Sequence, residues 1–215
     1  MDLTKVILEG ELQQQQEIKQ YYQFQSKIYD LTRWAFLFGR LGVFKKIAFQ
    51  KSDSFHIAEI GCGTGFNLNH LAKQFPRAKF TGVDVSKEMI NITRHKLGKY
   101  ADGIKLYNLP YGLDSSFLKP APDIILFSYS LSMINPQWED LIEKAYEDLA
   151  IGGKIMVVDF YHSKFPFFKN HMANHHVRMD EHILPVLKKH FKTNYSAVKS
   201  AYGGLWEYFM FIGDK

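Results

Sequence analysis

Short apolar runs alternate along the chain with longer segments in which apolar residues recur every three or four positions. The first pattern is typical of strands buried on both faces, and the second of helices that bury one face. A regular alternation of the two predicts a parallel sheet whose strands are connected through helices. The predicted strands span 56–60, 79–84, 104–107, 123–127 and 153–159, and the predicted helices span 67–74, 87–99 and 138–149.

The C-terminal part of the chain departs from this alternation. A short helix is predicted near 181–190, although Pro185 argues against a helix that is continuous through that position. Two strand-like runs follow at 193–201 and 205–212, and the Gly-Gly pair at 203–204 joins them. Such a pair is typical of a hairpin turn, so we expect an antiparallel hairpin at the C-terminus.

Length and composition fit one domain, since 215 residues can bury a sizeable core and 46% hydrophobic content is ordinary for a globular protein. Residues 1–50 look helical, and we expect them to form an N-terminal cap on a core of residues 51–215. The single cysteine, Cys62, cannot form an internal disulfide, and no spacing of Cys and His indicates a metal. With no signal peptide and no apolar run of about 18 residues, we expect a cytoplasmic protein.

Three closely spaced glycines follow the first predicted strand. Gly61, Gly63 and Gly65 lie between strand 56–60 and helix 67–74, where the chain must turn sharply. Glycine permits such a turn and lets backbone N–H groups approach a ligand closely, in front of a helix N-terminus. The segment therefore predicts a cofactor site at the end of the first strand.

The acidic residues around this turn indicate which cofactor binds. Asp84 ends the second predicted strand, where a carboxylate can accept hydrogen bonds from both hydroxyls of a ribose. The dinucleotide fingerprint G-x-G-x-x-G requires a glycine where this chain has Phe66. Glu59 would repel a pyrophosphate, whereas it suits a ligand that carries an ammonium group. The pattern therefore favours S-adenosylmethionine over NAD.

The segment Glu59–Gly65, together with Asp84, resembles the first two motifs of the class I S-adenosylmethionine-dependent methyltransferases. The resemblance covers roughly residues 55–160, and the predicted hairpin agrees with the usual ending of that fold. It implies an α/β fold, namely a doubly wound, seven-stranded, mostly parallel sheet of Rossmann-like topology with a C-terminal antiparallel hairpin. It also implies an enzyme that uses S-adenosyl-L-methionine as its cofactor.

In the resembled family, cofactor contacts come from the carboxyl ends of consecutive strands. Met89 would cover the adenine, with simple packing in the core as the alternative. Asn108 and the N–H of Leu109 would read the adenine edge, although an Asn here is also typical of a turn. The cofactor-binding residues that the resemblance implies are Glu59, Gly61, Cys62, Gly63, Gly65, Asp84, Val85, Met89, Asn108, Leu109, Ser128 and Tyr129, together with Tyr29 for the cofactor carboxylate.

Two segments combine aromatic with basic residues, one at 28–49 and one at 160–169, directly after the fifth predicted strand. In the resembled fold both regions cover the mouth of the active site. Trp and Phe flanked by Lys and Arg suit a lipid headgroup interface, and a net charge of +5 with a pI near 9.1 is compatible with an anionic surface. The alternative is that these aromatic residues only pack the cap onto the core.

The basic charge would also be compatible with nucleic acid, but the lysines are scattered rather than gathered into a groove. The segment Asn108–Tyr111 looks like the Asn-Pro-Pro-Tyr motif of amino methyltransferases that act on nucleic acids and glutamine. That motif belongs after the fourth strand, whereas this segment follows the third. We therefore expect no nucleic-acid partner.

The two ends of the chain resemble a narrower family. Tyr29–Trp34 with Phe38–Arg40, and Ala201–Tyr208 near the C-terminus, are similar to bacterial betaine-lipid methyltransferases, which trimethylate the amine of diacylglyceryl-homoserine and are related to soluble phosphatidylethanolamine N-methyltransferases. This resemblance implies N-methylation of a lipid amine headgroup and peripheral contact with the anionic inner membrane surface. The alternatives are a methyltransferase acting on O or N of a soluble small molecule, and a cofactor-binding protein without methyl transfer.

The expected chemistry is an in-line displacement by a neutral amine on the sulfonium methyl, in which the protein mainly aligns and desolvates the reactants. His162 is the candidate base that keeps the amine unprotonated, and Tyr29 is the candidate that orients the cofactor during the step. Arg33 and Arg40 would hold an acceptor carboxylate or a lipid phosphate. Tyr161 and His162 complete the predicted acceptor site, a structural role is the alternative for each residue, and no metal is expected.

Overall fold

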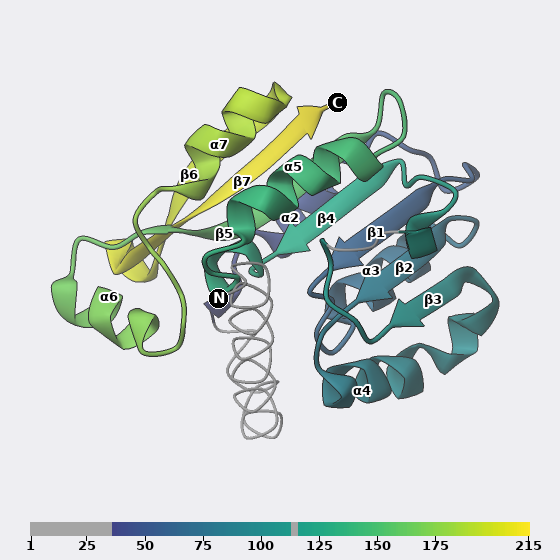
Figure 1. Cartoon of the computed structure of the whole chain (residues 1–215), viewed down its shortest axis with the longest axis horizontal. Helices are drawn as coiled ribbons and strands as arrows, with labels where there is room; N and C mark the ends of the chain where they lie inside the picture. Colours follow the sequence, from purple (N-terminus) through teal and green to yellow (C-terminus); the bar gives the residue numbers. More distant parts are fainter. Residues whose placement is uncertain (1–35, 113–115) are drawn as a thin grey trace, which may run out of the picture.

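The computed structural model of the chain, drawn in Figure 1, describes residues 36–112 and 116–215. Its centre is one seven-stranded sheet in the order β3-β2-β1-β4-β5-β7-β6. Strands β1 to β5 pair in parallel, while β7 pairs antiparallel with both β5 and β6. The strands are β1 (His56–Ile60), β2 (Lys79–Val83), β3 (Ile104–Tyr107), β4 (Ile124–Ser128), β5 (Lys154–His162), β6 (Lys192–Ala201) and β7 (Trp206–Asp214). The predicted fold class is therefore confirmed, down to the C-terminal antiparallel hairpin.

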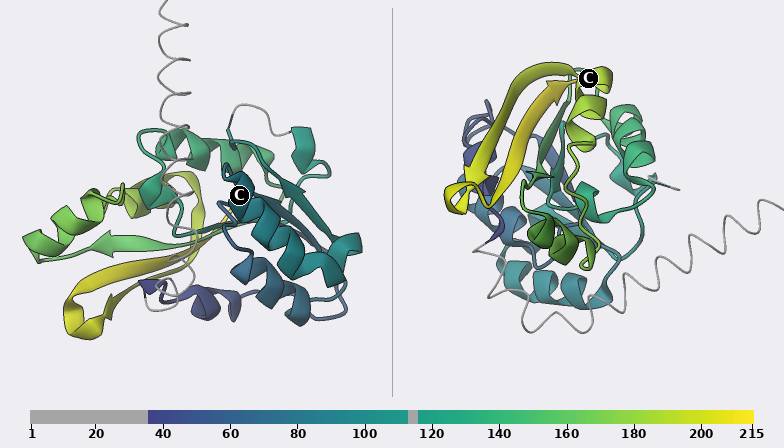
Figure 2. Two further views of the ribbon diagram at one scale, coloured as in Figure 1. Left: turned by 90° about the horizontal axis from the view of Figure 1, so that it is seen from below. Right: turned by 90° about the vertical axis from the view of Figure 1, so that its left-hand side faces the viewer.

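Helices cover both faces of the sheet (Figures 1 and 2). The α-helices are α2 (Arg40–Phe44), α3 (Phe66–Gln74), α4 (Lys87–Leu97), α5 (Trp138–Asp148), α6 (Pro166–Ala173) and α7 (Ile183–His190), and the 3-10 turns are η1 (Gly98–Gly103), η2 (Ser116–Leu118), η3 (Leu131–Met133) and η4 (Tyr202–Gly204). Apolar residues of α2, α3, α4 and α6 share one core cluster with one face of the sheet, and those of α5 and α7 share a second cluster with the other face. Because both faces are covered, every residue of β4 is buried, and this explains its continuous apolar run.

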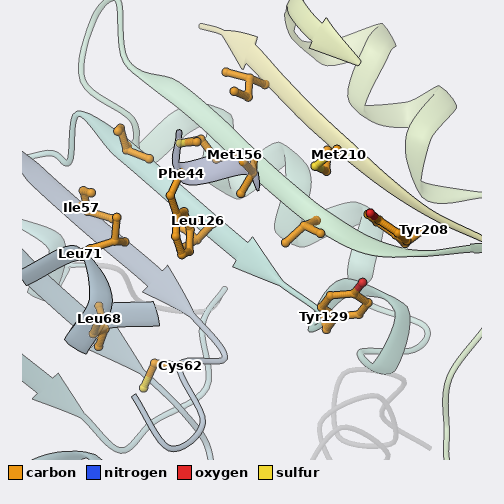
Figure 3. Packing of buried hydrophobic residues seen from close by; sticks show 14 of the residues in the cluster. Phe44, Ile57, Cys62, Leu68, Leu71, Leu126, Tyr129, Met156, Tyr208 and Met210 are labelled. Carbon is orange, nitrogen blue, oxygen red and sulfur yellow. The ribbon is translucent and has the colours of Figure 1, made fainter. Parts of the chain in front are cut away.

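The first core cluster joins the N-terminal part of the described chain to the sheet. Phe44 of α2 and Leu68 and Leu71 of α3 lie with Leu126 of β4 and Met156 of β5 in this cluster (Figure 3). In α3 the buried leucines are three positions apart, so they fall on the helix face that meets the sheet. The glycine turn that precedes α3 is thereby held in place by a fully buried helix face.

The order of the strands fixes where a ligand can bind. β1 has β2 on one side and β4 on the other, so the direction of winding reverses between β1 and β4. In open α/β sheets the crevice at such a switch point, outside the carboxyl ends of the strands, is the usual ligand site. The segments after β1, β2, β3 and β4 all meet there, and they are the ones that carry the predicted cofactor motifs.

One predicted boundary is wrong in a way that matters for function. The fifth strand was expected to end at 159, with Phe160, Tyr161 and His162 in a loop, but β5 continues to His162. The extension is stabilised by β7, because Phe160 pairs with Tyr208 and His162 with Glu207 across a β-bulge. Sequence pattern alone could not reveal this pairing, since the partner strand lies more than forty residues further along the chain.

The segment after β5 also differs from the expectation, because residues 166–173 form α6 instead of a loop. Pro166 is the first residue of this helix, a position where its fixed φ and missing N–H are favourable. In α7 the helix begins at Ile183, so Pro185 falls in the first turn. In the first turn an N–H group has no partner within the helix, so a proline there costs no hydrogen bond. Pro185 is therefore compatible with a continuous helix.

Of the predicted N-terminal cap, residues 1–35 lie outside the described residues. In residues 36–50, Phe36 is helical and the five-residue α2 follows, with a turn after it. The division into a cap and a core thus stays a prediction. Within the described ranges, no helix is long and apolar enough to cross a bilayer.

Candidate functional site

The glycine turn between β1 and α3 is built by backbone hydrogen bonds to the neighbouring strand. The N–H groups of Gly61 and Cys62 both donate to the carbonyl of Val83, at 2.8 and 3.0 Å. Gly65 caps α3 with a left-handed φ of 70°, a conformation that favours glycine. A Cβ at Gly65 would also lie 2.6 Å from Cγ2 of Thr93, so neither the conformation nor the space admits a side chain.

Asp84 is the side chain that organises this turn. Its carboxylate is only 8% exposed, and Oδ2 accepts the N–H of Gly63 at 2.8 Å while Oδ1 accepts the N–H of Ser86 at 2.9 Å. These two bonds fix the carboxylate at the end of β2, facing the glycine turn. Each carboxylate oxygen has a second acceptor direction, so the group can still receive the two hydroxyls of a ribose.

Glu59 lies beneath the same turn. Its side chain is 1% exposed, and Oε1 accepts a hydrogen bond from Nδ2 of Asn67, in the first turn of α3, at 2.5 Å. On the other side, Oγ1 of Thr93 donates to the carbonyl of Gly63 at 2.7 Å. Asn67 and Thr93 thus support the turn, and sequence reasoning missed both because neither lies within a motif. Two buried carboxylates beside a glycine turn can accept hydrogen bonds from ribose hydroxyls and from an ammonium group, and this pair of acceptors fits S-adenosylmethionine.

The predicted adenine contacts have structural partners as well. Met89 is fully buried in α4, and Val85 is half-buried just before the Ser86 cap of that helix. Asn108 donates from Nδ2 to the carbonyl of Asp84 at 3.0 Å, so it ties the end of β3 to the end of β2. Leu109 packs at the edge of the second core cluster. The structure thus places Val85 and Asn108 beside Asp84 and Met89 in the helix that follows it, and all contacts with adenine stay predictions.

At the end of β4, Ser128 and Tyr129 are both buried. Tyr129 has a left-handed φ of 56°, and its hydroxyl donates to the carbonyl of Phe38 at 2.7 Å. Burial raises the pKa of Tyr129 well above its usual range, so the hydroxyl stays protonated and remains a donor. Oγ of Ser130 donates to the carbonyl of Ile60 at 3.0 Å, and this bond joins the carboxyl ends of β1 and β4.

The predicted acceptor role of Arg40 stays a prediction, but the structure shows what the side chain contacts. It is buried in α2, where Nε donates to the carbonyl of Leu37 at 3.1 Å and the guanidinium lies 4.2 Å from the centre of the Phe66 ring. Phe66 is the first residue of α3, so Arg40 is placed against the glycine turn. Of its predicted companions, Tyr29 and Arg33 lie outside the described residues.

A buried acid that the sequence analysis did not single out holds the loop after β4. The carboxylate of Asp159, fully buried in β5, accepts from Oγ of Ser132 at 2.5 Å and from the N–H groups of Ser132 and Phe160 at 3.1 and 2.8 Å. Burial raises the pKa of Asp159 to about 6, while these donors oppose the rise. A lone acid at the end of an otherwise apolar strand was the signal that could have found it.

Tyr161 and His162 lie on the extension of β5, beyond its pairing with β4. Both are half-buried, and both contact Glu181, with 3.1 Å between Nδ1 of His162 and Oε1 of Glu181 and 3.3 Å between the Tyr161 hydroxyl and Oε2. Their acceptor roles stay predictions. Among the described side chains, no three of His, Cys, Asp or Glu gather into a group that could hold a metal ion.

Comparison with known proteins decides the class of this site. Residues 58–155, which include the glycine turn and Asp84, match the family model described as "Methyltransferase domain". Over this stretch, which is a little under half of the chain, the sequence is similar to the class I S-adenosylmethionine-dependent methyltransferases. S-adenosylmethionine is accordingly the cofactor of this domain, and the alternative of an NAD-type site is set aside.

Curated relatives match this methyltransferase domain over about half of the chain. The malonyl-[acyl-carrier protein] O-methyltransferase of Bacillus cereus is 25% identical over 123 residues, which are 56% of this chain and 43% of that protein. The trans-aconitate 2-methyltransferase of Paracidovorax citrulli is 29% identical over 106 residues, which are 49% of this chain and 39% of that protein. The chain therefore matches less than half the length of these relatives.

The fold has close counterparts among solved structures. The N-methyltransferase NodS of Bradyrhizobium japonicum WM9, solved in complex with S-adenosyl-L-homocysteine, superposes with a TM-score of 0.65. The two chains are 14% identical, and the superposition covers 82% of this chain and 85% of NodS. At this identity the likeness establishes the shared fold of the methyltransferase domain, and it leaves the acceptor open.

Proposed function

We propose that the chain transfers the methyl group of S-adenosylmethionine to the amine headgroup of a membrane lipid. The observation that carries this proposal is a ridge of exposed aromatic side chains, Phe36, Phe38 and Tyr202, beside the carboxyl end of β4. The hydrogen bond from Tyr129 to the carbonyl of Phe38 fastens this aromatic ridge to the end of β4. Exposed aromatic groups at such a place favour an acceptor with an apolar body.

The two aromatic-basic segments support the same proposal. Residues 37–49 and 160–172 both contribute side chains to the core cluster on one face of the sheet. The segment after β5 is also fastened to the C-terminal hairpin, because Oγ of Ser163 donates to the carbonyl of Leu205 at 2.6 Å. Exposed lysines accompany them at Lys45 and Lys46. Near an anionic membrane each such cation contributes about 1 kcal/mol of attraction.

In the proposed reaction, S-adenosylmethionine supplies a methyl group on a positively charged sulfur. Asp84 would hold the ribose, and Glu59 would face the ammonium end through the glycine turn. The ends of β1 and β4, joined by Ser130, would fix the position of the acceptor relative to the cofactor. For a primary or secondary amine, His162 would accept the proton that the methylated nitrogen loses, so that the product leaves as a neutral amine.

A second candidate function is methylation of a soluble acid. The observation that favours it is the named activity of the curated relatives, which act on malonyl-[acyl-carrier protein] and on trans-aconitate. Arg40, buried beside the glycine turn, supplies a cation that would suit an acidic group. This candidate needs no aromatic ridge, so the two functions make different demands on the same surface.

Turnover separates the two candidates. Labelled S-adenosylmethionine is incubated with the protein and either a bacterial lipid extract or a set of soluble di- and tricarboxylic acids, and the products are separated by chromatography. Label in an amine-containing lipid is the result we expect. Label only in the soluble acids contradicts the lipid proposal and establishes the second candidate.

Vesicle binding tests the surface itself. We expect co-sedimentation with anionic vesicles that weakens as salt is raised, because exposed charges are screened. Lys45→Glu/Lys46→Glu should weaken this binding by at least roughly 30-fold, because about 1 kcal/mol of attraction is lost for each lysine and each glutamate adds repulsion. The matched control is Lys188→Glu/Lys189→Glu, an exposed pair on α7 over the opposite face. Equal losses in both variants, or no binding of the wild type at low salt, contradict the proposed surface.

A further inference from the structure

The chain between α6 and α7 crosses the sheet where β4 has already ended. The N–H of Arg178 donates to the carbonyl of Ser132, in η3 after β4, at 3.0 Å. Two residues on, Asp180 forms an isolated antiparallel bridge with His162, and the N–H of Glu181 donates to the carbonyl of Tyr161 at 3.1 Å. We name residues 176–182 the crossing segment. β4 pairs with residues 154–158 of β5, and the crossing segment lies beside the residues of β5 that follow them.

This arrangement brings one carboxylate against the candidate base. Oε1 of Glu181 lies 3.1 Å from Nδ1 of His162, and Oε2 accepts the hydroxyl of Tyr161 at 3.3 Å. Glu181 holds this position with a left-handed φ of 66°, which is uncommon for a residue other than glycine. Such a conformation persists where the surroundings determine it, and here two side chains and one backbone bond do so.

The neighbouring charged residues Arg178, Asp180 and His182 contact one another. The neighbouring carboxylate, Asp180, is engaged by Arg178 at 2.7 Å and by His182. Hydrogen bonds and charge from these partners lower the pKa of Asp180 against the opposing effect of its burial. Burial, followed by the nearby charge of Glu181, raises the pKa of Tyr161, so its hydroxyl stays a donor to Glu181.

We propose that Glu181 is a positioning residue that holds His162 as the proton acceptor of the methyl-transfer reaction, an inference that rests on the proposed function. With Nδ1–H donating to the Glu181 carboxylate, the lone pair of the neutral imidazole lies on Nε2. When the amine nitrogen bonds the methyl carbon and the carbon–sulfur bond breaks, the amine becomes an ammonium. Its proton passes to Nε2, and the imidazolium that forms is paired with the Glu181 carboxylate.

The test compares Glu181→Asn with Asp180→Asn. Asparagine tolerates the left-handed conformation, but its side chain is too short to keep the contact with Nδ1 of His162. The control alters the adjacent carboxylate, whose partners are Arg178 and His182. Nitrogen-15 NMR of labelled histidine, at a pH where the ring is neutral, reports which ring nitrogen carries the proton.

We expect the Nδ1–H tautomer of His162 in the wild type and in Asp180→Asn, and a mixture of tautomers in Glu181→Asn. With a lipid amine as acceptor, kcat of Glu181→Asn should fall by about 10- to 100-fold while affinity for S-adenosylmethionine stays within about twofold. An unchanged tautomer in Glu181→Asn, or an equal loss of kcat in both variants, overturns this inference alone. Absence of methyl transfer to any lipid amine by the wild type overturns the proposed function, and the inference with it.

Discussion

The cofactor half and the acceptor half of this domain are built in different ways. Around the glycine turn, buried carboxylates hold backbone N–H groups, as Asp84 holds Gly63 and Ser86. On the acceptor side, half-buried and exposed side chains meet because distant segments cross, as the exposed Glu181 meets the half-buried His162. The first kind of site depends on one short motif and its neighbouring strand. The second depends on how several long-range contacts combine, so we expect mutations to affect the two halves differently.

The largest effect should come from Asp84→Ala. The change removes the proposed acceptor of two ribose hydroxyls and also the partner of two backbone N–H groups. Each hydrogen bond to a charged group contributes roughly 1.5–3 kcal/mol, so the affinity for S-adenosylmethionine should fall by at least about 100-fold. Isothermal titration calorimetry measures the change, and circular dichroism checks that the variant folds. Affinity within twofold of wild type would mean that Asp84 does not bind the ribose.

Alanine substitutions at two glycines should separate the cost of backbone strain from the cost of a steric contact in the cofactor site. Gly65 and Gly203 have nearly the same left-handed φ, 70° and 65°, but only Gly65 has close neighbours. Gly203→Ala should therefore cost about 1–2 kcal/mol of unfolding free energy from strain alone. Gly65→Ala adds the contact with Thr93, which costs about 1–3 kcal/mol more, and it should also weaken cofactor binding. Denaturant unfolding of both variants measures the difference. Equal losses of unfolding free energy would show that the Thr93 side chain can move aside without loss of stability.

The contrast between the cofactor half and the acceptor half also explains which elements and site residues could be predicted from the sequence. The strands and helices of residues 56–149 were predicted to within about two residues, because buried strands and amphipathic helices have local patterns. The glycines and Asp84 could be singled out because their spacing is set by one strand–helix–strand unit, β1–α3–β2. The support from Asn67 and Thr93 was missed because side chains that bond the turn can come from any nearby helix position.

On the acceptor side, local pattern was not enough. The residues from Phe160 to His162 form a strand only because β7 returns beside them, and the contact with Glu181 needs the crossing segment. Arg40 was assigned to the acceptor from its charge alone, and its packing on Phe66 beside the glycine turn could not be read from the sequence. Such contacts follow from tertiary structure, and no spacing within the sequence encodes them.

A third prediction concerns Asp159, which links the halves through Ser132. Its pKa is raised from 3.8 to about 6, so between these values the folded state binds more protons than the unfolded state. The contribution of this group to stability is therefore fully present below its unfolded pKa and is lost as pH rises toward 6. The stability of the wild type relative to Asp159→Asn should fall by roughly 2 kcal/mol between pH 4 and 7.

Denaturant unfolding at several pH values measures this slope. Asp214→Asn is the control of opposite sign, because the hydrogen bond from Lys154 is the largest cause of the lowered pKa of Asp214. The stability that this carboxylate contributes is present above its unfolded pKa and lost as pH falls. A difference between wild type and Asp159→Asn that does not change with pH would show that Asp159 titrates normally.

The smallest effect on stability should come from Phe167→Ser, on the acceptor side. Phe167 and Phe168 are adjacent in α6, but Phe167 is 67% exposed whereas Phe168 is 7% exposed and belongs to the core cluster. Phe167→Ser should change the unfolding free energy by less than about 0.5 kcal/mol, and Phe168→Ser should cost roughly 3 kcal/mol or more. If the exposed ring inserts among lipid headgroups, Phe167→Ser should bind anionic vesicles several-fold more weakly, with an unchanged affinity for S-adenosylmethionine. Unfolding, vesicle sedimentation and calorimetry on the two variants give these three quantities. Vesicle binding equal to that of wild type would remove α6 from the proposed membrane surface, and it would leave the cofactor half as it stands.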